Sequence, residues 1–296
     1  MTPGYEDKTL KEKALQMAKQ MRIGVVAPGT RIEPETAERV KAYAADAFLD
    51  SAPEIVFHPQ CFLSDGHFAG SDDQRAEAFL DYANDPKFDA LWFARGGYGA
   101  CRIAEAVMGG YHESARKKAY LGYSDGGALL AGLYKLGFPH VAHGPMPVDI
   151  SREGGEAAVK RALAYLIERG PETLELTVTH DTKTAAFNIM ILSSILGTPL
   201  EPDLTGHVLM LEEVSEYLYR IDRALFHITS SDRIRRVRGI KLGRVSATPE
   251  NDKPFGADEE EIARFWCKRS GIPYLGRADI GHDIDNRVVP FGMLMR

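Results

Sequence analysis

Cysteine is scarce in this sequence, and no two cysteines lie close together. Cys61, Cys101 and Cys267 are odd in number, and no Cys-x-x-Cys pair occurs. A disulfide framework or a structural zinc site would need closely spaced cysteines. We therefore expect three free thiols in a reducing compartment and no bound metal.

The sequence also lacks long apolar runs, and its first residues do not predict a secretory leader. No stretch approaches the ~20 consecutive apolar residues that a membrane helix needs. The first twenty residues are polar and rich in lysine, with no apolar core and no small-residue cleavage site. These absences predict a cytoplasmic protein that does not interact with a membrane.

The sequence also has fewer basic residues than acidic residues. The chain has 36 lysine and arginine residues against 42 aspartate and glutamate residues, so its formal net charge is −6. Nucleic acids and anionic membranes do not attract such a surface, and neither is an expected partner. The basic segment 233–238 is the one exception, and we interpret it as a solvated face.

Alternating apolar and amphipathic segments characterise the first half of the chain. Short apolar runs, typical of buried parallel strands, cover residues 22–27, 54–58, 89–93 and 120–123. Segments with helical spacing lie between them. The alternation predicts an α/β protein whose N-terminal domain contains a flavodoxin- or Rossmann-like parallel sheet.

The pattern changes in the second half of the chain. One amphipathic helix is expected over 154–169, and alternating segments, turns and a stretch rich in glycine, proline and valine follow it. These features predict a smaller, β-rich C-terminal domain. We therefore divide the chain into an α/β domain at 1–160 and a β-rich domain at 161–296.

A serine stands at the apex of the glycine-rich segment 121–127, Leu-Gly-Tyr-Ser-Asp-Gly-Gly, between a predicted strand and a predicted helix. A Gly-x-Ser-x-Gly step at such a junction forces a sharp turn that lifts the hydroxyl out of the backbone. The loops that follow parallel strands meet at one edge of the sheet, where ligands bind. Ser124 is therefore the candidate nucleophile of a serine hydrolase.

Hydrolysis by a serine requires a base that a third group orients. His282 is one candidate for the base, because it follows a glycine in a polar loop. His143 competes with it, although we favour the interpretation that His143 holds its own turn.

The orienting acid is predicted at the end of an apolar strand, where Glu212 and Glu213 would be costly to bury unpaired. Alternation along the strand puts Glu212 on the face of Met210 and Glu213 on the opposite face. The residues themselves do not choose between the two carboxylates. Both could instead pair with the arginines that follow, Arg220 and Arg223.

The oxyanion of such a reaction needs preorganised N–H donors. The N–H of Asp125, directly after the serine, is one donor, and the loop at 95–99, Arg-Gly-Gly-Tyr-Gly, can supply another. This loop lacks the Lys-Ser/Thr ending of a phosphate-binding loop and the spacing of a dinucleotide fingerprint. We expect no cofactor.

Several segments, taken in order, resemble the LD-carboxypeptidase family of serine peptidases. They lie at 23–28, 68–75, 94–99, 122–125, 143–146, 196–199, 211–213, 219–223 and 281–282. The resemblance spans nearly the whole chain. It implies a triad of Ser124, His282 and Glu212 that is divided between the two domains, with the backbone of Gly97 and Asp125 as the oxyanion hole.

Substrate binding is expected in the glycine-rich loop, at Arg95, Gly96 and Tyr98. A free carboxylate on the substrate would be bound bidentately by an arginine. The candidates are Arg95, Arg102, Arg220 and Arg223.

The function that the resemblance implies is release of the terminal D-alanine from murein tetrapeptides during cell-wall recycling. The cleaved bond joins the L-centre of a diamino acid to D-alanine. Members of the family are cytoplasmic, metal-independent and usually homodimeric. A related branch confers immunity by hydrolysing microcin C, a peptidyl-nucleotide whose base stacks on an additional aromatic loop. This chain has only Trp92 and Trp266, both expected in packed positions, which favours the murein peptide.

Two further hypotheses are an unrelated α/β-hydrolase esterase and a silent muropeptide-binding homologue. The esterase would have its triad in a single sheet, and the silent binder would not need to keep all three triad residues. The chain departs from the family pattern at Gly127, where a hydroxyl residue is usual, and at Ala186-Phe187-Asn188, where a glycine pair often precedes the asparagine. Both departures concern the substrate cleft.

Overall fold

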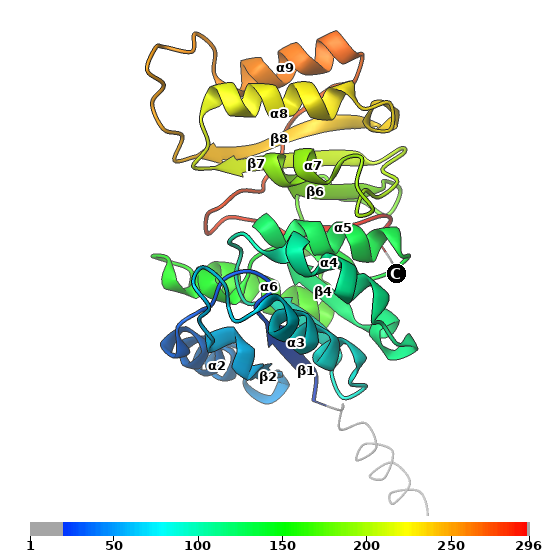
Figure 1. The fold of residues 1–296 in the computed structure, drawn as a ribbon. Coiled ribbons are helices and arrows are strands. Elements are labelled where there is room, and N and C mark those ends of the chain that lie inside the picture. The colour runs from blue at the N-terminus through cyan, green and yellow to red at the C-terminus, as the bar shows by residue number, and fades with distance from the viewer. Residues whose placement is uncertain (1–19, 295–296) are drawn as a thin grey trace, which may run out of the picture.

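Two sheets with helices packed against them make up residues 20–294, the part of the chain that the computed structural model describes (Figure 1). The first sheet has six strands in the order β10-β5-β4-β3-β1-β2. These strands are β1 (Arg22–Val26), β2 (Glu54–Phe57), β3 (Ala90–Phe93), β4 (Ala119–Gly122), β5 (Val141–His143) and β10 (Val289–Pro290). Neighbouring strands are parallel except for β10 with β5.

The order of strands β1 to β5 is the flavodoxin-like order 2-1-3-4-5, which reverses direction between β1 and β3. Strands β3 and β4 are buried along their whole length. Burial on both faces explains why they appear in the sequence as unbroken apolar runs. The expected α/β fold with an N-terminal parallel sheet is confirmed.

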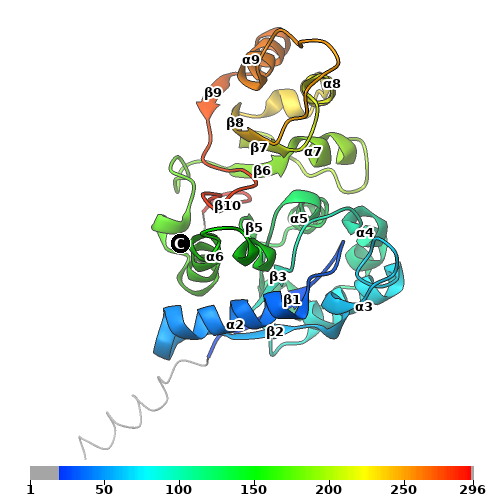
Figure 2. The same cartoon turned by 90° about the vertical axis from the view of Figure 1, so that its left-hand side faces the viewer.

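Helices cover both faces of this sheet. They are α2 (Pro34–Phe48), α3 (Asp72–Asn84), α4 (Ala100–Gly109), α5 (Gly127–Lys135) and α6 (Glu156–Glu168). Helices α3, α4 and α5 pack on one face, and α2 and α6 pack on the other (Figure 2). None of the helices within 20–294 has both the length and the apolar character that a bilayer crossing requires.

The second sheet has four parallel strands in the order β6-β7-β8-β9. They are β6 (Thr184–Asn188), β7 (Val208–Val214), β8 (Gly239–Ser246) and β9 (Tyr274–Arg277). Each connection contains a helix, in turn α7 (Ile189–Ile195), α8 (Leu218–Ser230) and α9 (Glu259–Ser270). The sequence predicts a smaller, β-rich C-terminal domain, and this part of the chain contains a second, smaller sheet, whose parallel form follows from these helical crossovers.

The chain crosses between the two sheets twice. The segment 169–183 leads from α6 to β6, and α6 itself, which runs through residue 160, packs on the first sheet. After β9 the chain returns, and Val289 and Pro290 of β10 pair with β5. The first sheet thus includes residues from the C-terminal part of the chain. The division into two domains at residue 160 stays a prediction.

Glycines on both sides of Ser124 allow a close approach by Phe93. A Cβ at Gly122 would lie 2.5 Å from Cδ2 of Phe93, and one at Gly126 would lie 2.7 Å from the same atom. Real Cβ contacts are not this short. The two glycines therefore let the completely buried Phe93 support the turn that carries the serine.

Replacing Gly122 by alanine is expected to destabilise the protein by about 1–3 kcal/mol, because the new methyl group overpacks against Phe93. Gly109→Ala is the matched control, since Gly109 is helical and a Cβ there meets nothing within 4 Å. Alanine in that helix should be neutral or stabilising by up to about 1 kcal/mol. Urea unfolding of both variants measures the difference. Equal midpoints for G122A and the wild type would show that Phe93 moves aside at no cost.

Candidate active site

Ser124 begins the short 3-10 segment η4 (Ser124–Gly126), just after β4. Its φ is 58°, in the left-handed region that residues other than glycine rarely adopt. Backbone strain of this kind persists only where the surrounding structure enforces it, and it is common at functional sites. The sharp turn expected from the sequence is therefore present, with the serine at its apex.

The loop after β3 reaches this serine. A Cβ at Gly96 would lie 2.7 Å from both Cβ and Oγ of Ser124, so only glycine lets the loop come this close. Thr30, in the loop after β1, donates its hydroxyl to the carbonyl of Gly96 (3.0 Å). Gly97 follows with a φ of 89°. The serine and the glycine-rich loop thus meet at the carboxyl edge of the sheet, where such folds bind ligands.

Arg75 joins the same loops, although the residue pattern of the sequence predicted no role for it. Its guanidinium donates to the carbonyl of Pro28, after β1, and to that of Gly99, after β3 (2.8 Å), and it also pairs with Asp72. The side chain is completely buried. The only signal in the sequence was its place in 68–75, one of the segments that carry the family resemblance.

His282 and Glu212 form the central polar contact of the site. Nδ1 of His282 lies 2.6 Å from Oε2 of Glu212, and it donates a hydrogen bond to this carboxylate. Glu212 is completely buried, and the side chain of His282 is 9% exposed. As predicted, Glu212 lies on the same face of β7 as Met210, which packs against Ile280. Because the carboxylate engages Nδ1, Nε2 is left to exchange a proton.

Two opposing effects determine the pKa of His282. Burial lowers this pKa, whereas the charge of Glu212 and the hydrogen bond to it raise it. The charges of Glu213 and Asp149 act in the same direction as that of Glu212. The net result is a pKa above the ordinary histidine value of 6.5. The imidazolium form of His282 is therefore more favourable in this site than it would be if burial acted alone.

Glu213 points to the other face and makes different contacts. Its carboxylate accepts hydrogen bonds from the side-chain amide of Asn188 (2.6 Å) and from the N–H of Met190 (3.0 Å), which fixes the start of α7. Burial raises the pKa of Glu213, although these hydrogen bonds oppose the shift. Arg220, one of the arginines considered as a partner, pairs instead with Glu216 (3.3 Å).

His143, the competing histidine, is buried. Burial lowers the pKa of His143 to about 4, so its imidazole is neutral at pH 7. Its Nε2 lies 3.3 Å from Oδ1 of Asn286, and this oxygen also accepts the N–H of Gly281 (3.2 Å). These contacts support a structural role for His143, which helps to anchor the loop that carries His282.

Tyr123 brings the two halves of the site together. Its ring centroid lies 4.8 Å from that of His282, and its hydroxyl donates to Oδ1 of Asp149 (2.9 Å). Since Tyr123 directly precedes Ser124, the predicted base lies close to the predicted nucleophile. No hydrogen bond joins Ser124 to His282 within residues 20–294, and catalytic hydrogen bonds of this kind often form only with substrate bound.

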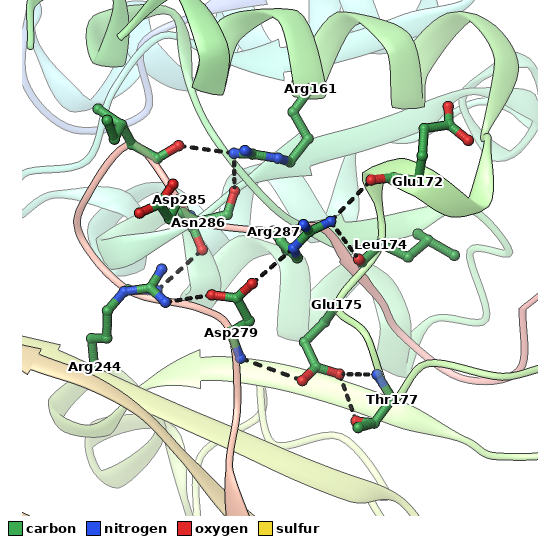
Figure 3. A network of polar contacts seen from close by, with 12 residues as sticks. Arg161, Glu172, Leu174, Glu175, Thr177, Arg244, Asp279, Asp285, Asn286 and Arg287 are labelled. Atoms are coloured by element: carbon green, nitrogen blue, oxygen red, sulfur yellow. Dashed lines mark hydrogen bonds and ion pairs between the residues drawn. The ribbon is translucent and has the colours of Figure 1, made fainter. Parts of the chain in front are cut away.

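Arg244 holds the loop 279–287, which carries His282, against the second sheet (Figure 3). This arginine lies on β8 and pairs with Asp279 (2.6 Å) and with Asp283 (2.8 Å). The two aspartates stand on either side of the histidine in the sequence. A rigid guanidinium that binds both therefore restricts the path of the loop between them.

Arg161 and Arg287 tie the same loop to the rest of the chain (Figure 3). Arg161, on α6, donates to the carbonyl of Asn286 (2.9 Å). Arg287 pairs with Asp279 (2.8 Å) and donates to the carbonyl of Glu172 (3.0 Å), in the segment between the two sheets. The loop is thus fixed to both sheets.

The three residues expected to bind substrate all lie in the loop after β3. Gly96 contacts the serine, and Tyr98 is 53% exposed. Nη1 of Arg95 donates to the carbonyl of Arg31 (3.2 Å), whereas its buried Nε has no hydrogen-bond partner within the described part of the chain. Arg102, another candidate for the substrate carboxylate, is already paired with Asp72 (2.8 Å).

Both tryptophans are in packed positions. Trp92 is completely buried and donates its indole N–H to the carbonyl of Pro145 (2.7 Å). Trp266 is half-buried and donates to Asp222 (2.9 Å). Each indole N–H is therefore engaged in the fold.

Comparison with known proteins extends over most of the chain. Models of the LD-carboxypeptidase N-terminal and C-terminal domains match residues 23–144 and 183–296. A Synechocystis sp. protein named as a carboxypeptidase is 30% identical over 280 residues, which cover 92% of this chain and 89% of that protein. The murein tetrapeptide carboxypeptidase of Pseudomonas aeruginosa is 25% identical over 295 residues, with coverages of 92% and 91%.

Solved structures share the fold. The muramoyltetrapeptide carboxypeptidase of Oxalobacter formigenes superposes with a TM-score of 0.76 at 22% identity, covering 92% of this chain and 95% of that one. The microcin C7 self immunity protein MccF in its wild-type apo state gives a TM-score of 0.74 at 17% identity, covering 93% and 92%. At these identities the likeness concerns the architecture.

Titration of the imidazole nitrogens by NMR should distinguish the two histidines of the site. His282 is expected to titrate above pH 6.5, and His143 to stay neutral until the pH approaches its pKa of about 4. Glu212→Gln should lower the pKa of His282, because it removes the charge that raises this pKa while burial remains. The neighbouring Glu213→Gln is the matched control and should lower it less. An unchanged pKa of His282 in E212Q would contradict the pairing.

Proposed function

Because the chain belongs to the LD-carboxypeptidase family, we propose that it is a serine-type enzyme that releases the C-terminal D-alanine from murein tetrapeptides. The bond hydrolysed joins the L-centre of the diamino acid to D-alanine. We further propose that the enzyme acts in the cytoplasm, as a homodimer and without a cofactor. The observation that carries the proposal is the buried Glu212–His282 pair. The ring of His282 packs against Tyr123, which directly precedes the strained Ser124.

In this mechanism Glu212 holds the proton of His282 on Nδ1, so that Nε2 can take the proton of the Ser124 hydroxyl. The serine oxygen then attacks the carbonyl carbon of the diamino acid. The N–H groups of Gly97 and Asp125 donate to the oxyanion of the tetrahedral intermediate. The intermediate collapses to an acyl-enzyme while the imidazolium gives its proton to the departing amine of D-alanine. Water, deprotonated by the same imidazole, then hydrolyses the acyl-enzyme.

We assign the free carboxylate of the substrate to Arg95. Its guanidinium donates to the carbonyl of Arg31 (3.2 Å) but pairs with no carboxylate within residues 20–294, and its loop continues into Gly96, beside the serine. Arg102 and Arg220, by contrast, are already engaged in ion pairs. A bidentate guanidinium there would select substrates with a free C-terminus, which is the property that defines a carboxypeptidase.

Ser124→Ala is expected to lower the rate of D-alanine release from a diaminopimelate-containing tetrapeptide by about 10⁶-fold, because the triad acts as a unit. Ser51→Ala is the matched control, since Ser51 lies before β2, at the opposite edge of the sheet, and should keep full activity. Free D-alanine is measured with purified enzyme. Near-normal release by S124A would refute the nucleophile. No release by the wild type would favour the microcin C-type hydrolase, for which a peptidyl-adenylate is the substrate to try.

The acidic limb of kcat/KM should follow the pKa of His282, because the base must be neutral to accept the serine proton. In the wild type this limb is expected above pH 6.5, since the pKa is raised. Glu212→Gln should move the limb to lower pH and reduce kcat by about 10⁴-fold, because the imidazole loses both its charge partner and its enforced tautomer. Glu213→Gln should shift the limb only slightly. A limb that stays in place in E212Q while the pKa of His282 falls would exclude His282 as the base.

A further inference from the structure

Asp149 is a buried carboxylate that the proposed mechanism does not use. It lies in the short 3-10 segment η5 (Pro147–Ser151), which follows β5. Its carboxylate accepts three hydrogen bonds, from the N–H of Met146 (2.8 Å), from Nε of Arg152 (3.0 Å) and from the hydroxyl of Tyr123 (2.9 Å). The first two donors are three residues away and belong to the local structure of η5. The third comes from the residue before the proposed nucleophile.

The segment that carries Asp149 is fixed to the first sheet and its helices. The N–H of Val148 donates to the carbonyl of Ala94, directly after β3 (3.0 Å). The carbonyl of Ile150 accepts a hydrogen bond from Arg39, on α2 (2.8 Å). Because the residues on both sides of Asp149 are anchored, its carboxylate is a fixed point to which the hydroxyl of Tyr123 is bonded.

Tyr123 connects this fixed point to both proposed reacting groups. Its backbone leads directly into Ser124, whose left-handed φ must be held in place by the surrounding structure. Its ring centroid lies 4.8 Å from that of His282, with 56° between the ring planes. The serine follows a strand of the first sheet, and the histidine follows a strand of the second. One side chain therefore borders a nucleophile and a base that come from different sheets.

The charge of Asp149 also acts on the base. Burial lowers the pKa of His282, and the charges of Glu212, Glu213 and Asp149 raise it. The other titratable groups beside this histidine are His143, Tyr123 and, in its own loop, Asp279, Asp283 and Asp285. Asp149 makes no hydrogen bond to the imidazole within residues 20–294, so it acts on the imidazole through space and through the tyrosine. A negative charge there stabilises the imidazolium that forms when the serine loses its proton.

We propose that Asp149 is a positioning residue of the hydrolase, which holds the hydroxyl of Tyr123 and thereby sets the position of Ser124 relative to His282. This inference rests on the proposed function and deepens it, since Asp149 acts through Tyr123 and not on the substrate. Without this hydrogen bond the ring of Tyr123 can turn, and the serine and the imidazole lose their alignment. A displacement of about 1 Å between reacting groups costs about 100-fold in rate.

The first test removes the hydroxyl of Tyr123 and keeps its ring. Tyr123→Phe should lower kcat for D-alanine release about 10- to 100-fold with little change in KM, because the lost bond aligns the reacting groups and does not bind substrate. Tyr120→Phe is the matched control. Tyr120 lies three residues earlier, on β4, is completely buried, and donates its hydroxyl to the carbonyl of Ala115 (2.9 Å). Y120F loses a hydrogen bond of the same length and should keep the wild-type kcat, so equal kcat values for Y123F and Y120F would overturn the proposal.

The second test distinguishes a positioning role from one that only stabilises the fold. Asp149→Asn removes a negative charge, so the pKa of His282 should fall and the acidic limb of kcat/KM should move to lower pH. Arg152→Gln removes the positive charge that is paired with this carboxylate, and it should move the same pKa upward. A loss of folding stability alone would leave the pKa of His282 in place in both variants.

NMR of His282 needs no substrate, so it separates a failure of this proposal from a failure of the proposed function. In Y123F the ring-proton signals of His282 should lose part of the ring-current shift that the tyrosine causes, whereas Y120F should leave them in place. Unchanged signals in Y123F, together with an unchanged pKa of His282 in D149N, would overturn the proposal. The expected changes without any release of D-alanine would support the positioning role and count against the proposed substrate.

Discussion

The burial of the Glu212 carboxylate is the constraint on which the rest of the site depends. A charge removed from water is stable only beside a cation or hydrogen-bond donors. One oxygen of Glu212 is bonded to His282, and the other has no partner within the described residues. The histidine is 70 positions away in the sequence. The fold therefore has to bring a distant loop to β7 and keep it there.

Arginine side chains meet this requirement from two directions. Arg244 binds the His282 loop to the second sheet, and Arg161 binds it to a helix of the first sheet. A guanidinium presents its donors in a fixed plane, so each arginine restricts orientation as well as distance. The imidazole of His143 adds a neutral contact from the first sheet. These polar contacts to one loop act beside a buried hydrophobic cluster that joins the two sheets, in which Leu129 of α5 and Phe187 of β6 both take part.

Features encoded in short stretches of sequence could be predicted, and those that join distant residues could not. Strands β3 and β4 were recognisable because burial on both faces leaves continuous apolar runs. Strand alternation placed Glu212 and Glu213 on opposite faces, and their separate contacts agree with it. Local periodicity could not show which of the two carboxylates contacts a histidine, because His282 is 70 positions away from Glu212 in the sequence. The role of Arg75 could not be predicted for the same reason, because the carbonyls that accept its hydrogen bonds lie 47 and 24 positions away.

The return of the chain to the first sheet affects when a newly made molecule can become active. The residues of the proposed triad leave the ribosome in the order Ser124, Glu212, His282, and β10 follows them. Before β10 is made, β5 is the edge strand of its sheet, with unpaired backbone groups. A partly synthesised chain would hold the strained serine without its base. In the proposed mechanism, peptide hydrolysis therefore waits for the late segment that supplies His282 and also closes the edge of the sheet.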